Sequence, residues 1–146
     1  MRLRTHREIS FPFGADELWK RIAAVERFPN WWPWLRTFDG QHLRAGETWE
    51  CTVQPPLPYT VSFTVTIDEI VVGQSIRAHV HGDIEGTAEL HLSPASDGCQ
   101  ARLATDLTPH KPSLRALSLA GLSIARFAHN RLVDAGIHQF ITRSTQ

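Results

Sequence analysis

Apolar and polar residues alternate along much of the first 110 positions, a pattern typical of strands that bury one face. The stretch from Leu3 to Phe11 alternates in this way and ends at Pro12, which predicts a first strand. Similar runs follow from about Leu35 to Thr108, and their apolar positions are Trp49, Cys51 and Val53; Val61, Phe63, Val65 and Ile67; Ile76, Ala78 and Val80; Ala88, Leu90 and Leu92; and Ala101, Leu103 and Leu107. Turn-forming residues separate the runs at Gly40, Gly46, Gly73, Gly82-Asp83, Gly86 and Asp97-Gly98. The pattern predicts a curved antiparallel sheet with one apolar face, which another element must cover.

Helical patterns lie on both sides of this region. A short helix opens at Ala15 with acidic residues in its first turn, and its apolar face consists of Leu18, Trp19, Ile22 and Ala23. No proline follows Pro112. The sequence therefore predicts a helix from Ser113 to about Arg143, roughly 45 Å long, which is enough to cover the sheet.

The predicted C-terminal helix has small residues in the middle of its apolar face. On a helical wheel this face consists of Leu114, Leu117, Gly121, Ile124, Ala125, Ala128, Leu132 and Ala135, with Gln139 continuing it. Gly121, Ala125 and Ala128 either let the helix approach the sheet closely or leave space for a ligand. The neighbouring strip consists of Ser118, Leu122, His129, Val133, Gly136 and Phe140. An outer strip is a candidate homodimer contact, and its apolar members are Leu119, Phe127, Ile137 and Ile141.

Three of the five tryptophans, Trp31, Trp32 and Trp34, fall in the segment from Phe28 to Leu35. Two prolines in this segment exclude a long helix, and no alternation indicates a regular strand. Aromatic side chains gathered in an irregular corner either close a core or form the wall of a ligand pocket. The residues alone leave both possibilities open.

The composition is that of one ordinary domain spanning residues 1–146, with 42% hydrophobic residues. Fifteen basic and fifteen acidic residues cancel, so the chain lacks the long-range field that attracts nucleic acid or anionic lipid. The first residues lack the apolar stretch of a signal peptide, and no segment is apolar enough to span a bilayer. We therefore expect a cytoplasmic protein with no nucleic-acid partner and no membrane span.

Cysteine and histidine spacing argues against a metal site. Cys51 and Cys99 form no Cys-x-x-Cys pair, which predicts reduced, partly buried thiols. The strand alternation places Arg77, His79, His81, Glu89 and His91 on the solvent side of the sheet, away from the apolar face. No nucleotide-binding, esterase or zinc-protease motif appears, so any catalysis is expected to proceed without a cofactor.

Four segments carry a resemblance to a known superfamily: Pro12 with Glu17-Leu18-Trp19, Val25 to Trp34, Gly82 to Gly86, and His129 to Gly136. Together with the order of elements, they resemble the START-like or SRPBCC superfamily, and within it the bacterial polyketide cyclase/dehydrase and lipid-transport group. The match covers nearly the full length, and its motifs mark the fold more than the activity.

The resemblance implies an α+β helix-grip fold, in which a curved antiparallel sheet of about seven strands wraps around a long C-terminal helix. Two short helices follow the first strand. Members of the superfamily hold aromatic polyketides, sterols, lipids or other hydrophobic molecules between sheet and helix, and some cyclise or dehydrate them. The resemblance therefore favours ligand space over close packing at Gly121, Ala125 and Ala128.

The candidate site residues fall into three groups. Apolar walls are expected from Trp31, Trp32, Trp34, Trp49, Phe63 and Leu132. The hydroxyl groups of Tyr59 and Thr105 are either structural or orient a ligand. His129 is a candidate general acid or base, and the alternative is a histidine that is hydrogen-bonded at the edge of the core. If its side chain points inward, Arg7 is a candidate partner for a ligand anion or enolate, and the alternative is an arginine in solvent.

Three functions are compatible with the sequence. The first is binding of a hydrophobic small molecule, a lipid, polyketide or aromatic metabolite, between sheet and helix. The second is a cofactor-free polyketide cyclase, aromatase or dehydratase that acts on a ligand in the same space. The third is an interaction or stress-response module whose core is filled by side chains.

Overall fold

One antiparallel sheet dominates the computed structural model, which describes residues 3–54, 60–110 and 122–144, with only the main chain described for 122–129 and 144. In these ranges the sheet has seven strands: β1 (Leu3–Phe11), β2 (Leu35–Phe38), β3 (Thr48–Val53), β4 (Val61–Val71), β5 (Ser75–Gly82), β6 (Ile84–Ala95) and β7 (Gly98–Pro109). Each predicted run of alternating residues forms a strand, so the predicted sheet is confirmed.

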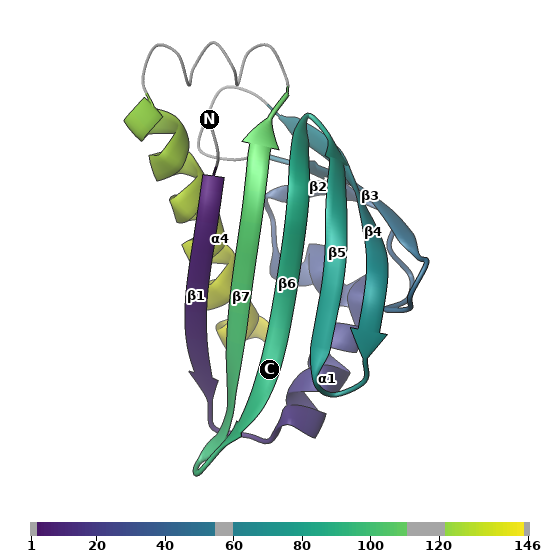
Figure 1. Cartoon of the computed structure of the whole chain (residues 1–146), viewed down its shortest axis with the longest axis vertical. Helices are drawn as coiled ribbons and strands as arrows, with labels where there is room; N and C mark the ends of the chain where they lie inside the picture. Colours follow the sequence, from purple (N-terminus) through teal and green to yellow (C-terminus); the bar gives the residue numbers. More distant parts are fainter. Residues whose placement is uncertain (1–2, 55–59, 111–121, 145–146) are drawn as a thin grey trace.

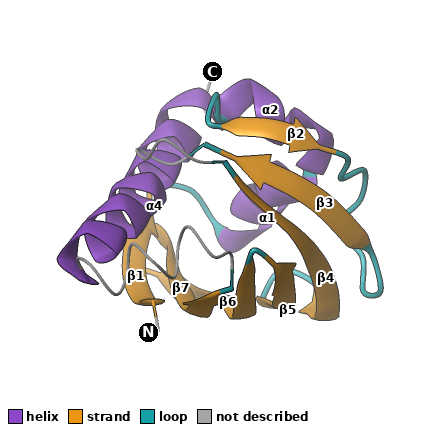
Figure 2. Ribbon diagram, turned by 90° about the horizontal axis from the view of Figure 1, so that it is seen from above, coloured by secondary structure: helices purple, strands orange, loops and turns teal. Residues whose placement is uncertain are grey.

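The strand order, β1-β7-β6-β5-β4-β3-β2, places the first two strands at opposite edges of the sheet. Strands β2 to β7 pair with their neighbours in sequence, and β1 pairs with β7 in a register from Leu3 opposite Leu107 to Phe11 opposite Cys99. The segment between β1 and β2 must therefore cross the sheet. In Figure 2 this segment lies on the concave face, inside the curve of the strands.

The helices lie on the concave side of the sheet (Figure 1). They are α1 (Ala15–Ala23), a 3₁₀ turn η1 (Val25–Arg27), α2 (Phe28–Trp31) and α4 (Leu122–Ser144). The two short helices predicted after the first strand are thus confirmed as α1 and α2. The predicted start of the last helix at Ser113 lies outside the described residues, and α4 ends close to its predicted end at Arg143.

The curvature of the sheet creates the space that the helices cover. Register shifts interrupt the ladder between Leu35 and Thr37 and between Ile67 and Glu69, and such bulges bend a strand and increase its twist. Seen from above, the sheet curls into a half-barrel and α4 lies across its open side (Figure 2). This is the predicted helix-grip architecture.

Gly86 corrects one detail of the sequence prediction, because it lies inside β6 and not in a turn. It pairs with Val80 on β5 and with Leu107 on β7. Its φ of +151° is one that side chains disfavour, and a Cβ atom there would collide with the main-chain carbonyl of Asp106. The glycine therefore permits a close approach of β6 and β7.

The main core lies between the aromatic corner and strands β2 to β5. Its buried members include Val25, Phe28, Trp31, Trp49 and Ile67. The ring of Phe28 lies 5.6 Å from that of Trp31 and 6.0 Å from that of Trp49, distances at which aromatic pairs are favourable. No helix within the described ranges is both long and apolar enough to cross a membrane.

Candidate functional site

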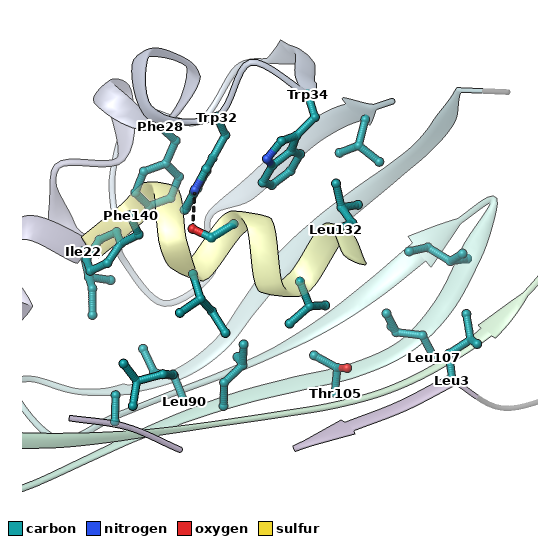
Figure 3. Close-up of a pocket in the computed structure, with 18 of the residues that line it drawn as sticks. Leu3, Ile22, Phe28, Trp32, Trp34, Leu90, Thr105, Leu107, Leu132 and Phe140 are labelled. Carbon is teal, nitrogen blue, oxygen red and sulfur yellow. Dashed lines mark hydrogen bonds between the residues drawn. The ribbon is translucent and has the colours of Figure 1, made fainter. Parts of the chain in front are cut away.

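A cavity of about 450 Å³ lies between the concave face of the sheet and α4 (Figure 3). This volume is in the range of small-molecule binding pockets in proteins. The floor of the cavity comes from the sheet, and its roof comes from α4, α1 and the aromatic corner. The described lining is almost entirely hydrocarbon.

The floor consists of residues that the strand alternation places on one face. They come from five strands and are Leu3, Ile9 and Phe11 of β1; Val53 of β3; Val61 and Phe63 of β4; Ile84 and Leu90 of β6; and Ala101, Leu103, Thr105, Leu107 and Pro109 of β7. Because β1 is paired with β7 along its full length, the inward side chains of these two strands form a long continuous part of this floor.

The roof brings together segments that are far apart in the sequence. Leu18 and Ile22 come from α1, Phe28, Trp32 and Trp34 from the aromatic corner, and Leu132, Val133, Gly136, Ile137 and Phe140 from α4. In Figure 3 the labelled aromatic side chains lie above and beside α4, opposite Leu90, Thr105 and Leu107 of the floor.

The two tryptophans of the roof are hydrogen-bonded to α4 through their only polar atoms. The indole Nε1–H of Trp32 donates to the main-chain carbonyl of Gly136 at 2.9 Å, and that of Trp34 donates to Oε1 of Gln139 at 2.7 Å. The two indole rings are stacked, with centroids 5.4 Å apart. Because both N–H groups are satisfied within the protein, the rings offer only their apolar surface to the cavity.

Thr105 is the exception to the apolar lining. Among the described lining residues, it is the one that contributes a hydroxyl group, and none of them carries a charge. Its Oγ1 atom is buried and has no hydrogen-bond partner in the described part of the chain. Burying a hydroxyl group without a hydrogen-bond partner costs free energy, so the hydroxyl group of Thr105 is a candidate partner for a bound molecule.

Arg7 lies on the inner face of β1 but is engaged by α4. Its Nε–H donates to Oδ1 of Asp134 at 3.0 Å, and a terminal nitrogen donates to Oδ1 of Asn130 at 3.5 Å. The Arg7 side chain is about one-third exposed. Arg7 therefore ties the edge strand to the helix, and it is not one of the residues that line the cavity.

The structure brings some of the predicted ligand-binding residues together and separates others. Trp32, Trp34, Phe63, Thr105 and Leu132 line the cavity. Trp31 and Trp49 are buried in the adjoining core and do not appear in the lining. Tyr59 and Gly121 lie outside the described residues, and so do the side chains of Ala125, Ala128 and His129. The roles of these five residues stay predictions.

The face that α4 turns toward the sheet differs from the predicted one. Val133, Gly136 and Phe140, expected on the neighbouring strip, line the cavity together with Leu132. Ile137 also lines it, so its assignment to the outer strip was wrong. Ile141 of that strip is exposed at 39%.

Sequence reasoning did not assign several lining residues to the site, among them Leu3, Phe11, Leu90 and Leu107. Their alternation predicted burial, and all four do lie on the inner face. A signal was therefore present, because every inward position of β1, β6 and β7 is a candidate for the cavity floor. The pattern carries no information on which inward positions pack and which leave space.

The outer face of the sheet carries the histidines, as predicted. His79 pairs with Asp68 at 2.7 Å and His81 with Glu85 at 2.8 Å, while His91 lies 3.5 Å from Glu89. At least half of each histidine side chain is exposed. In the described ranges, no three His, Cys, Asp or Glu side chains gather as metal ligands would.

Both cysteines are free thiols in buried positions, which confirms the prediction. Burial raises the pKa of Cys51 to about 12, and the nearby Asp39 carboxylate contributes to the rise. Burial also raises the pKa of Cys99. Since the thiolate is the reactive form, neither thiol is suited to nucleophilic chemistry near neutral pH.

Comparisons with known proteins identify the fold. No family model and no curated protein matches the sequence. Among solved structures, the Zhui aromatase/cyclase from Streptomyces sp. R1128 matches with a TM-score of 0.76 and 13% identity, over 99% of this chain and 94% of that one. The di-domain ARO/CYC StfQ from the steffimycin biosynthetic pathway matches with a TM-score of 0.74 and 11% identity, over 99% of this chain and 51% of that one.

A third match is norcoclaurine synthase from Thalictrum flavum, solved in complex with dopamine and hydroxybenzaldehyde. Its TM-score is 0.62 and its identity 13%, over 98% of this chain and 88% of that one. All three similarities extend over nearly the whole of this chain, at identities that carry information on the fold alone. The chain therefore shares the helix-grip fold of these three proteins, which is the fold that its resemblance to the START-like/SRPBCC superfamily predicted.

Proposed function

We propose that this protein binds a hydrophobic small molecule in the cavity between sheet and α4. The observation that carries the proposal is the combination of a volume of about 450 Å³ with a lining whose described residues are all apolar except Thr105. Water in such a space finds few hydrogen-bond partners, whereas an apolar ligand gains roughly 25 cal/mol for each Å² of surface that it buries.

The geometry of the roof supports a ligand site over a filled core. Trp32 and Trp34 are fixed by hydrogen bonds to Gly136 and Gln139, so the roof is held above a volume of about 450 Å³ that the described side chains leave open. An interaction module with a tightly packed core would leave no such volume. The cavity therefore counts against the third function that the sequence allowed.

The proposal is tested by filling the cavity from its floor. Leu103→Trp replaces a lining side chain of β7 with a much larger one. Arg102→Trp is the matched control, because it adds the same ring on the adjacent residue, whose side chain is 57% exposed. Both variants and the wild type are purified from the same host, and their native and denatured masses are compared, before and after incubation with aromatic polyketides, fatty acids and sterols.

We expect wild type and Arg102→Trp to carry a small molecule that is lost on denaturation, and Leu103→Trp to carry none. Circular dichroism verifies that all three proteins are folded. Absence of any bound molecule in the wild type, from the host or from the panel, would overturn the proposal. Equal retention by Leu103→Trp would show that the ligand lies elsewhere.

A second candidate function is cofactor-free cyclisation or dehydration of the bound molecule. It is favoured by the similarity to two structures named as aromatase/cyclases. The candidate acid or base for this reaction is His129. Arg7, the other candidate catalytic residue, is already paired with Asp134. The expected signature is that His129→Ala abolishes turnover of a polyketide substrate and leaves binding unchanged. A variant that turns over substrate at the wild-type rate would exclude His129 from catalysis.

A further inference from the structure

The chemistry of the cavity lining restricts the class of ligand that fits it. None of the described lining residues carries a charge. Arg7 is a cation on the inner face of β1, and it is held by Asp134 and Asn130 of α4. Arg143, at the other end of the described part of α4, donates to the main-chain carbonyl of Trp31 at 2.8 Å.

A ligand carboxylate or phosphate placed against the described lining residues would lose its hydration without gaining a charged partner among them. Burying an unpaired ion is far more costly than burying a neutral polar group. A molecule with several carbonyl groups meets the same difficulty in a weaker form, because each unpaired oxygen adds a desolvation cost. The lining thus selects against anions and against chains rich in polar groups.

The buried hydroxyl of Thr105 supplies the one polar feature of the floor. The residue lies near the middle of β1, β6 and β7, opposite Thr5 on one side and Ala88 on the other. Figure 3 shows its side chain on the cavity side of the strands, between Leu90 and Leu107. Valine would occupy nearly the same volume without leaving Oγ1 unpaired, so the described packing gives no reason for a hydroxyl here.

We propose that the preferred ligand is an uncharged, mostly hydrocarbon molecule with a single hydroxyl or carbonyl group that hydrogen-bonds to Thr105. This inference rests on the proposed binding function. A rotation of the threonine side chain to another of its staggered positions brings Oγ1 to the cavity surface. The hydroxyl can then donate to a carbonyl or exchange a hydrogen bond with a hydroxyl. One such bond in an apolar cavity fixes the orientation of the whole molecule.

The test uses three probes that share a naphthalene ring and differ at one end. They are the hydrocarbon 2-ethylnaphthalene, the alcohol 2-(2-naphthyl)ethanol and the carboxylate anion of 2-naphthaleneacetic acid. Their dissociation constants are measured at pH 8 by isothermal titration calorimetry for wild type, Thr105→Val and Thr105→Ser. Valine removes the hydroxyl and keeps the volume, whereas serine keeps the hydroxyl. Thermal unfolding followed by circular dichroism verifies that both variants are folded.

We expect Thr105→Val to weaken binding of the alcohol about fivefold to tenfold and to leave 2-ethylnaphthalene within about twofold of wild type. Thr105→Ser should bind the alcohol at close to the wild-type affinity. The carboxylate should bind wild type at least about tenfold more weakly than the alcohol.

The outcomes separate this inference from the proposed function. Binding of the hydrocarbon together with an alcohol affinity that Thr105→Val does not change would overturn the role of Thr105 alone. A carboxylate that binds as tightly as the alcohol would overturn the preference for uncharged ligands. Failure of all three probes to bind would overturn the proposed function itself, and the inference with it.

Discussion

The indole N–H of Trp32 donates to the main-chain carbonyl of Gly136 at 2.9 Å, joining two segments that are 104 residues apart in the sequence. Gly136 also lets the neighbouring ring of Trp34 lie close to α4, because a Cβ atom at position 136 would lie only 3.2 Å from Cζ2 of Trp34. The aromatic corner is the last part of the segment that crosses the sheet from β1 to β2, and this bond fixes the corner to α4 above the cavity. The contact therefore holds the roof of the proposed site.

Replacing Trp32 with phenylalanine should lower the free energy of unfolding by about 1 kcal/mol from the lost hydrogen bond, plus a smaller packing loss. Phenylalanine keeps an aromatic ring in the roof but cannot donate to Gly136. Urea unfolding followed by circular dichroism measures the change. Trp34→Phe is the comparison, and we expect a smaller loss there because the Gln139 amide can turn to another partner. A Trp32→Phe protein as stable as wild type would show that the bond does not hold the roof.

Gly86→Ala should be among the most destabilising small substitutions in this chain. The added methyl group would collide with the Asp106 carbonyl of the neighbouring strand, at a φ of +151° that alanine disfavours. We expect a loss of at least about 2 kcal/mol, measured by urea unfolding.

Gly14→Ala is the matched control for this substitution. Its φ is −70°, and a Cβ atom there meets nothing within 4 Å. The control should change the stability by less than about 1 kcal/mol. Equal effects of the two substitutions would contradict the close approach of β6 and β7.

The sheet was predictable from the sequence because its signal is local. Alternation with a period of two places Leu3, Phe11 and Leu107 on one face whatever the rest of the chain does. The face of α4 was not predictable in the same way, because apolar residues occur all around this helix and no side stands out. In the observed orientation of α4, Trp32 is hydrogen-bonded to Gly136 and Trp34 to Gln139. These are tertiary contacts between distant segments, which a local pattern in the sequence does not reveal.

The cavity itself was only partly predictable. The aromatic corner was correctly singled out as the place to look, but its rings have different positions: Trp32 and Trp34 line the cavity, and Trp31 packs in the core. Whether an inward ring fills space or borders it depends on the distance between two layers, which hydrophobic patterning does not encode. Alternation left open whether Arg7 points inward or into solvent, and its pairing with Asp134 depends on how α4 lies over β1.

Asp134→Asn should lower stability by less than about 1 kcal/mol, because the pair with Arg7 is partly exposed and well hydrated. The difference from wild type should shrink in 0.5 M NaCl, since salt screens the attraction. Glu8→Gln is the control, as its pair with Arg102 is longer, at 3.7 Å, and more than half exposed on both sides. Urea unfolding at low and high salt measures both variants. A loss at Asp134 that does not respond to salt would contradict an ionic tie between β1 and α4.

The thiol of Cys51 should make stability fall at alkaline pH. Burial, assisted by Asp39, raises its pKa in the folded protein from 9.0 to about 12. Between these two values the unfolded chain has lost the proton that the folded chain keeps. The unfolded state therefore binds fewer protons, and the free energy of unfolding falls as pH rises, by at most about 1.4 kcal/mol per pH unit from this group.

The comparison of wild type with Cys51→Ala isolates this effect from the other groups that titrate at high pH. Below pH 9 the two stabilities should differ by a constant amount, because the thiol is protonated in both states of the wild type. Above pH 9 the wild type should lose its advantage progressively. Urea midpoints measured at intervals from pH 7 to pH 11 give the two curves. Curves that stay parallel over this range would mean that the Cys51 thiol titrates alike in the folded and unfolded protein, and that its burial does not raise its pKa.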